Sequence, residues 1–325
     1  MQTLLYLSKN DIAAINLDMR SVIEQVEIAI RELGNGDTDM PPKTGIHPGR
    51  AADDFIHAMP AQVPLMAAAG LKWVSSYASN SARGLANISG LIVLNDPNTG
   101  VPLAVMDCTW ITAARTGAAT ALSARYLARA ESSTVGILGP GVQGMSNLRA
   151  INELFAIKTV RVFGSRRETA EQFARNMSDE LGLEIAAVDH PRAAVSGLDI
   201  VVTAGPILKT PHATIKRGWL DEGSFASLVD FDSYWSREAL AEADIFTTDE
   251  KNQYRYYRDE KGYFQNCPEL HADLGELVTG KRKGRESSAQ RTFAANLGVA
   301  IEDMAVALLV YRKARQIDVG TVLPI

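Results

Sequence analysis

Apolar positions near the start of the chain recur with the period of a helix. In the segment SVIEQVEIAIRELGNGD, Ser21 and Glu24 have the spacing of a capping box, and Gly34 is a typical helix stop. The pattern therefore predicts an amphipathic surface helix from Ser21 to Gly34. Its apolar stripe consists of Val22, Ile23, Val26, Ala29, Ile30 and Leu33.

From about residue 55 to residue 107 the helical period gives way to short apolar runs broken by Gly, Pro and Asn. The sequence NDPNTG separates Leu91–Leu94 from Leu103–Met106, and turn residues between two apolar runs predict a hairpin. The first third of the chain is therefore expected to be a helix followed by an antiparallel sheet.

After residue 133, apolar runs of strand length alternate with helical segments, one from about Val142 and one through RRETAEQFARNMSDELG. This order predicts a parallel, doubly wound sheet. A last segment, NLGVAIEDMAVALLVYRKARQ, predicts an amphipathic helix that packs back on the first domain. The predicted strands are Thr134–Leu138, Thr159–Phe163, Glu184–Val188, Ile200–Ala204, Ser224–Leu228 and Ile245–Thr248.

The turn after the first of these strands, in TVGILGPGVQG, has the spacing G-x-G-x-x-G. That spacing is weak alone, but here it follows a strand and opens a helix, which is the arrangement of a dinucleotide site. Gly139 permits the tight turn, Gly141 lets the backbone approach a pyrophosphate, and Gly144 allows close packing of helix on strand. Val142 and Gln143 begin the helix, whose unpaired N–H groups would face the phosphates.

The end of the second strand of this unit indicates which dinucleotide binds. The chain has FGSRRET there, with Ser165, Arg166 and Arg167 where an acidic residue would bond the ribose of NAD(H). Since a guanidinium suits a 2′-phosphate, the sequence predicts NADP(H) as the preferred cofactor, with NAD(H) possible. Alternatively, Arg166 and Arg167 are ordinary solvated residues in the first turn of the next helix and do not recognise the cofactor. Thr203, after the strand in DIVVTAG, is expected near the ribose or nicotinamide on topology alone.

The chain has 325 residues, 46% of them hydrophobic, which is enough for one large or two medium domains. Its formal net charge of -5 argues against an electrostatic nucleic-acid partner. The basic cluster at Lys281, Arg282, Lys283 and Arg285 is too short to reverse this, and we interpret it as a solvated loop.

No run approaches the roughly 18 apolar residues of a membrane span, and no secretion signal is visible. Cys108 and Cys267 lie far apart without ligand spacing, so two free thiols in a reducing, cytoplasmic location are expected. The five histidines are scattered, and we expect no metal site.

Several segments together resemble the ornithine cyclodeaminase/mu-crystallin family over nearly the whole chain. The resemblance implies an α/β fold: a Rossmann-type doubly wound parallel sheet domain plus an N-terminal α/β domain for dimerisation and substrate binding. We expect these domains at residues 1–114 and 115–304, with the helix and tail of 305–325 returning to the first. The segments are GLKWV, SGLIVLNDPNTGVPLAVMD, ITAARTGAATALSARYLAR, ILGPGVQG, ELHADLGELVTGKRKGRES and NLGVAIEDMA.

Family members act on 2-amino or 2-imino acids, and the resemblance implies three main site residues. Arg115, in TAARTGA, matches the carboxylate-binding arginine, although a cap or salt bridge is its structural alternative. Lys72, in GLKWV, matches a lysine that contacts the carboxylate or polarises the reacting carbon–nitrogen bond; otherwise it extends to solvent. Asp232 falls at the acid/base aspartate, with Asp230 as a competitor and a helix cap as the alternative.

At two positions the chain departs from the family pattern. Lys43 stands where many relatives have an arginine, so it attracts a substrate carboxylate without gripping it bidentately. His57 replaces the glutamate of the ornithine-cyclising enzymes, which makes a diamino acid substrate less favoured. It is either a packed polar residue at a sheet edge or a proton carrier in the substrate site.

These features together favour an NADPH-dependent reductase of a cyclic or acyclic 2-imino acid, reversible as an amino-acid dehydrogenase. The alternatives are a cyclodeaminase with retained NAD(H), disfavoured by Arg166 and His57, and a non-catalytic NADPH-binding protein of the mu-crystallin kind. The expected partners are a small amino or imino acid and a second copy of the chain. A homodimer would cover the apolar sheet of the first domain.

Overall fold

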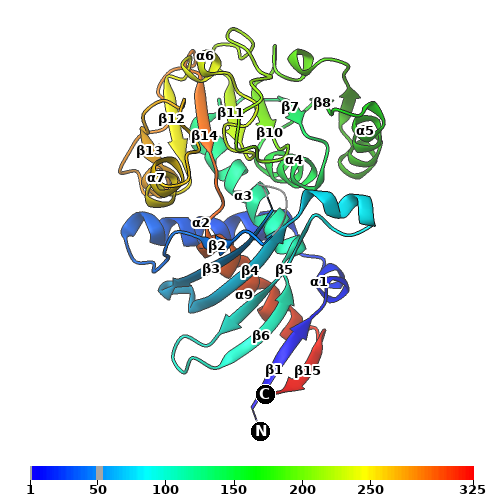
Figure 1. Ribbon diagram of the computed structural model, residues 1–325, viewed down its shortest axis with the longest axis vertical. Helices are drawn as coiled ribbons and strands as arrows, with labels where there is room; N and C mark the ends of the chain where they lie inside the picture. The colour runs from blue at the N-terminus through cyan, green and yellow to red at the C-terminus, as the bar shows by residue number, and fades with distance from the viewer. Residues whose placement is uncertain (1, 49–53) are drawn as a thin grey trace. The chain divides into compact units, whose positions relative to one another are not determined.

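The computed structural model describes residues 2–48 and 54–325, and its strands form two sheets (Figure 1). The chain forms two compact units. Unit 1 comprises residues 1–115 and 298–325, and unit 2 comprises residues 116–297. The second boundary therefore falls before the last long helix, whereas the sequence places it after residue 304.

Unit 1 contains a seven-stranded sheet in the order β15-β1-β6-β5-β4-β3-β2. The pairing of β1 with β6 is parallel and every other pairing is antiparallel. The predicted hairpin is confirmed, because β5 and β6 pair on either side of the NDPNTG turn. The strands are β1 Thr3–Leu7, β2 Thr44–Ile46, β3 Phe55–Val63, β4 Ala68–Ser76, β5 Ile88–Asn95, β6 Pro102–Asp107 and β15 Thr321–Pro324.

One face of this sheet is covered by helices. The helix α9 (Ala300–Gln316) contacts β3, β4 and β5, as well as α1 (Lys9–Ile15) and α2 (Met19–Asn35). This confirms the prediction that the last helix packs on the first domain. The short 3-10 helices Pro64–Met66 and Ala78–Arg83 connect the strands. Alternate side chains of the strands are buried on the covered face: Met59, Ala61, Val63, Lys72, Val74, Ile92, Leu94, Ala104 and Met106.

The ends of α2 differ from the prediction. The helix cap is Asp18, whose carboxylate accepts the backbone N–H of Ser21 at 2.8 Å, so Ser21 lies inside the first turn. The helix continues through Gly34 and ends at Gly36, which has a φ of 86°. An aspartate three residues earlier outcompetes Ser21 as the cap, and only the second glycine adopts the left-handed conformation that stops a helix.

Unit 2 contains an eight-stranded sheet in the order β13-β12-β14-β11-β10-β7-β8-β9, in which every pairing is parallel. Figure 1 shows α4 and α5 beside β7 and β8, and α7 beside β12 and β13. The Rossmann-type parallel sheet predicted from the sequence is confirmed. The strands are β7 Thr134–Leu138, β8 Thr159–Phe163, β9 Glu184–Ala187, β10 Ile200–Thr203, β11 Phe225–Leu228, β12 Ile245–Thr248, β13 Ala272–Asp273 and β14 Thr292–Ala295.

The strand order reverses between β7 and β10, since β8 and β9 extend the sheet on one side and β10 begins the other. In open α/β sheets, ligands bind beyond the carboxyl ends of the strands at such a switch point. The helices of this unit are α3 Thr109–Leu127, which begins in unit 1, α4 Val142–Leu154, α5 Arg167–Leu181, the 3-10 helix Pro191–Ala194, α6 Arg237–Leu240, α7 Lys251–Asp259 and α8 Leu274–Val278.

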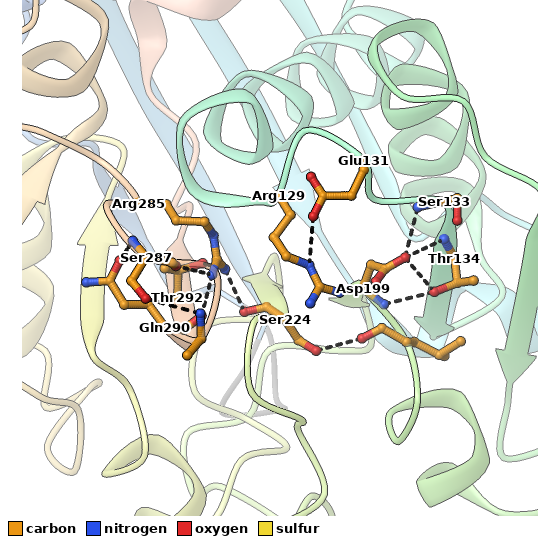
Figure 2. A network of polar contacts seen from close by, with 12 residues as sticks. Arg129, Glu131, Ser133, Thr134, Asp199, Ser224, Arg285, Ser287, Gln290 and Thr292 are labelled. Carbon is orange, nitrogen blue, oxygen red and sulfur yellow. Dashed lines mark hydrogen bonds and ion pairs between the residues drawn. The ribbon is translucent and has the colours of Figure 1, made fainter.

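A polar network fastens the opposite, amino-terminal edge of the same sheet (Figure 2). Asp199, just before β10, accepts a hydrogen bond from Arg129 and the backbone N–H groups of Ser133 and Thr134. The half-buried Arg285 donates to the carbonyl oxygens of Leu127, Ser224, Ser287 and Gln290 and to the hydroxyl of Thr292. The solvated-loop interpretation is therefore wrong for Arg285, which anchors the loop, and holds for the exposed Lys281, Arg282 and Lys283.

Within the described ranges 2–48 and 54–325, no helix combines the length and apolar character needed to cross a bilayer.

Candidate active site

The glycine-rich turn of unit 2 lies at the switch point of the sheet. Gly139 has a φ of 109°, and a Cβ atom there would lie 2.5 Å from the carbonyl oxygen of Ala204, at the end of β10. A Cβ atom on Gly144 would collide with the carbonyl oxygen of Gly139. Both positions therefore require glycine, one for the turn and the other for the packing of α4 on it.

Gly141 differs from its neighbours because a Cβ atom there would meet no described atom within 4 Å. Its φ of -99° is ordinary for any residue, so neither packing nor backbone strain explains a glycine at this position. As the N-cap of α4 it offers no side-chain cap, which leaves the N–H groups of Val142, Gln143 and Gly144 at the helix start without a side-chain acceptor. Open space in front of uncapped N–H groups fits a pyrophosphate.

The three residues that follow Gly164 after β8 differ in their contacts. Ser165 and Arg166 are exposed, and Arg166 is the N-cap of α5. Within the part of the chain that the structure describes, the Arg166 guanidinium makes no ion pair or hydrogen bond. The guanidinium of Arg167 instead pairs with Glu171, at 2.7 Å, and with Asp189.

Thr203 and Asp230 are joined at the carboxyl ends of β10 and β11. The Thr203 hydroxyl donates to Asp230 Oδ1 at 2.6 Å, and the Gly205 N–H donates to Oδ2 at 2.9 Å. Burial raises the pKa of Asp230 to about 7, against the lowering effect of these two bonds. Sequence reasoning placed Thr203 by topology, but it did not reveal that Asp230 holds it.

Asp232 belongs to the same loop but faces other residues. It is 3% exposed, and the backbone N–H of Phe264 bonds its carboxylate. Burial raises the pKa of Asp232 above its ordinary value. The helix that follows is capped by Ser236, so the capping role considered for Asp232 falls to another residue.

Unit 1 holds a buried cluster of four charged residues. The ammonium of Lys72, on β4, lies 2.5 Å from Asp303 Oδ2. Arg115, on α3, donates from Nε to Asp303 Oδ1 at 3.1 Å and from Nη1 to Glu302 Oε2 at 3.2 Å. Lys72 does not extend to solvent, since it is 1% exposed, and burial lowers its pKa while Asp303 raises it.

Glu302 and Asp303 are the members of this cluster that sequence reasoning missed. Both lie in the first turn of α9, where carboxylates favour the helix start, and that pattern alone marks neither as a site residue. The available signal was two adjacent acids followed by a long apolar run, from Met304 to Val310. Gly298, with a φ of 80°, also belongs here, because a Cβ atom at this position would collide with the Arg115 guanidinium.

Lys43 and His57 lie toward the β2 edge of the unit 1 sheet. Lys43 precedes β2 and is 9% exposed. His57, on β3, is paired with Gly45, and its ring stacks on Phe55 with centroids 3.9 Å apart. His57 is therefore a packed polar residue one strand in from the edge, since β3 also pairs with β4, and a role in the substrate site stays a prediction.

Unit 2 has the turn, helix start and switch point of a dinucleotide-binding α/β domain, and unit 1 adds a buried pair of cations. The chain belongs to the ornithine cyclodeaminase/mu-crystallin family, whose model matches residues 5–318. It is 34% identical to the alanine dehydrogenase of Archaeoglobus fulgidus over 99% of this chain and 98% of that protein.

Two solved structures share the whole fold. The Δ1-pyrroline-2-carboxylate reductase of Thermococcus litoralis, in complex with NADH and L-proline, is 35% identical, with 98% of this chain and 99% of that chain covered and a TM-score of 0.89. An archaeal alanine dehydrogenase dimer with bound NAD is 31% identical, with 99% of each chain covered and a TM-score of 0.88.

Proposed function

We propose that the protein is an oxidoreductase that reduces a 2-imino acid to a 2-amino acid with a nicotinamide cofactor, and that it prefers NADPH. In the reverse direction it is an amino-acid dehydrogenase. The named activities of the relatives, pyrroline-2-carboxylate reductase and alanine dehydrogenase, are of this class. The observation that carries the proposal for this chain is the buried pair Lys72 and Arg115, two cations in the core of unit 1.

We assign Arg115 and Lys72 to the substrate. A guanidinium and an ammonium are the side chains that pair with a carboxylate, and surroundings that screen charge poorly strengthen each such pair. Glu302 and Asp303 balance the two positive charges and fix the direction of each side chain. Lys43 adds positive charge without a bidentate grip, and His57 brings no carboxylate for a distal amine, so a monoamino acid is favoured over ornithine.

We assign Asp232 to proton transfer at the substrate nitrogen. Both carboxylate oxygens of Asp230 already accept hydrogen bonds from Thr203 and Gly205, whereas within residues 2–48 and 54–325 the bonds at the Asp232 carboxylate come from backbone N–H groups. A carboxyl with a raised pKa can hold a proton near neutral pH and give it up during the reaction. The free choice of partners therefore supports Asp232 over Asp230, whose two oxygens are engaged by Thr203 and Gly205.

We assign the cofactor to the turn of unit 2, which would hold its pyrophosphate at Gly141, Val142 and Gln143, with Thr203 nearby. When bound, the reduced nicotinamide supplies the hydride that adds to C2 of the imine. The protein supplies charge placement and orientation, which are the main sources of acceleration in such a transfer. Arg166 supports the preference for NADPH, because it is exposed next to β8 and is not paired with a carboxylate in the described chain.

The direct test is an initial-rate screen at 340 nm with NADPH and NADH in parallel. The substrates are pyrroline-2-carboxylate, piperideine-2-carboxylate, and pyruvate or glyoxylate with ammonium or methylamine. Oxidation of NADPH with one of these imines is the expected result. Ammonia release from ornithine without a net change at 340 nm would replace the reductase by a cyclodeaminase, and cofactor binding without turnover would favour a binding protein.

A further inference from the structure

The loop after β11 has a conformation that its sequence alone does not explain. Phe231 has a φ of 64°, a strained value for a residue with a bulky side chain. In this backbone conformation the Phe231 ring packs in an aromatic cluster with Tyr257, Tyr263 and Phe264, at centroid distances of 5.7, 5.3 and 5.0 Å. Strain of this kind persists where the surroundings fix the residue, and its effect here is to direct Asp230 and Asp232 to different neighbours.

Asp230 faces the end of β10. Its two oxygens accept one bond each from the Thr203 hydroxyl and the Gly205 N–H, so the carboxylate spans the segment Thr203–Gly205. The indole N–H of Trp235, from the same loop, donates to the Thr203 hydroxyl oxygen at 3.3 Å. The side chain of Asp230 is thus a clamp on three consecutive residues at the switch point.

The other side of that segment touches the cofactor turn. The carbonyl oxygen of Ala204 lies so close to Gly139 that a Cβ atom would approach it to 2.5 Å, and the Ala204 N–H donates to the carbonyl oxygen of Leu138 at 2.7 Å. The segment Thr203–Gly205 therefore lies between Asp230 and the turn. A shift of Thr203–Gly205 would therefore move the backbone atoms against which the glycine-rich turn packs.

We propose that Asp230 is a positioning residue for the nicotinamide cofactor: its carboxylate holds Thr203–Gly205 against the phosphate-binding turn, and the ionised form is the one that does so. The proposal rests on the proposed function, because it requires the turn to bind the cofactor. A protonated carboxyl has one hydroxyl in place of an acceptor. On Oδ2 that hydroxyl would oppose the Gly205 N–H, and on Oδ1 it would reverse the Thr203 bond and remove the negative charge that strengthens both bonds, so protonation weakens the clamp.

The surroundings of Asp230 set the pH at which its carboxylate is protonated. The pKa of Asp230 is raised to about 7, mainly by burial and in smaller part by the neighbouring Asp232. Tyr234, the other titratable group facing Asp230, has a pKa raised to about 12 and stays neutral near pH 7. Thr203 and Gly205 do not titrate. Cofactor affinity is therefore expected to be high above neutral pH and to fall as the pH drops through about 7.

The test measures NADH binding by fluorescence from pH 6 to pH 8, since the 2′-phosphate of NADPH itself titrates near 6. For the wild type we expect the dissociation constant to rise about tenfold from pH 8 to pH 6. Asp230→Asn keeps an acceptor for only one of the two bonds and carries no charge, so it mimics the neutral carboxyl: its dissociation constant at pH 8 should be about tenfold higher and nearly independent of pH. Thr203→Val should weaken binding but keep the pH dependence.

Asp221→Asn is the matched control. Asp221 also accepts a glycine N–H, that of Gly197 at 2.9 Å, but it precedes β11 and so lies at the opposite edge of the sheet. It should bind NADH as the wild type does. Wild-type affinity that does not change between pH 6 and pH 8, or an Asp230→Asn protein with the wild-type affinity and profile, would overturn the proposal. A wild type that binds neither NADH nor NADPH would overturn the proposed function as well.

Discussion

At the scale of single residues, the buried ion pair of Lys72 and Asp303 makes a prediction about stability. Asp303→Asn leaves Lys72 buried beside a neutral amide, and removal of one partner of a buried pair costs about 3–5 kcal/mol of unfolding free energy. Since the pKa of Lys72 already lies below that of a free lysine, the unfolded chain binds more protons between the two values. The unfolding free energy that Asp303→Asn loses relative to the wild type should therefore be largest at low pH and should diminish as the pH rises toward 10.

Thermal unfolding from pH 6 to pH 9.5 checks this expectation. Lys72→Met combined with Asp303→Asn is the control, because it removes both charges and should recover part of the lost stability. A single Asp303→Asn variant as stable as the wild type at pH 6 would show that the pair does not hold the cluster. Activity of the single variant should also fall, since Asp303 contacts both cations assigned to the substrate.

Arg166 makes a separate residue-scale prediction about the cofactor. Arg166→Asp should lower the ratio of kcat/KM for NADPH to that for NADH by at least about tenfold, because a carboxylate repels the 2′-phosphate that the guanidinium attracts. Arg175→Asp is the matched control: it makes the same charge change on the same helix, two turns further along, at an exposed position. An unchanged ratio in Arg166→Asp would refute the assignment and favour the alternative of a solvated first-turn residue.

At the level of secondary-structure elements, two glycines of the glycine-rich turn have different roles: Gly144 is required for packing, whereas Gly141 faces the space proposed for the ligand. Gly141→Ala places its methyl group in open space, so the midpoint of thermal unfolding should stay within about 2 °C of wild type while cofactor affinity falls at least about tenfold. Gly144→Ala should behave oppositely in stability, because its methyl group meets the carbonyl oxygen of Gly139. Calorimetry and NADH titration of both variants test the pair. Full affinity in Gly141→Ala would mean that the open space is not the phosphate site.

The elements that the sequence predicts well are those with a strong local pattern. The strands β7, β8 and β12 have the predicted ends, because each is a short apolar run between turn residues. Periodicity does not reveal α3 (Thr109–Leu127), since that helix is buried on nearly every side and has no polar stripe. It also misses β15, whose four residues are all exposed and whose pairing with β1 joins the two ends of the chain. Such pairing depends on contacts distant in sequence.

In the candidate site, too, features with a local sequence pattern could be predicted and features set by distant contacts could not. The residues of the turn could be located because a phosphate-binding turn needs glycines at fixed spacing. Glu302, Asp303 and the bonds of Asp230 could not, because they are defined by contacts across 188 positions between Arg115 and Asp303, or by the direction of a strained loop. Arg285 was misjudged for the same reason, since its acceptors are backbone carbonyl groups that no sequence pattern marks.

At the scale of the whole molecule, we propose a homodimer formed through the uncovered face of the unit 1 sheet. Trp73 and Leu91 are paired across β4 and β5 on that face, and each is 44% exposed, so two large apolar side chains lie side by side on the surface. The double variant Trp73→Arg with Leu91→Arg should be monomeric by sedimentation, whereas the wild type should be a dimer. Arg312→Ala, on α9, is a control outside this face. A dimeric double variant would place the interface elsewhere.

In the proposed reaction, hydride passes from a reduced nicotinamide to C2 of an imino acid with net oxidation of the cofactor. The most direct measurement supplies NADPH deuterated at C4, on the face that is transferred, together with the imine that is active in the screen, and follows deuterium in the product by NMR. We expect one deuterium at C2 of the amino acid for each NADPH oxidised. Product without deuterium at C2, or deuterium that returns to the cofactor while ammonia leaves a diamino acid, would contradict it.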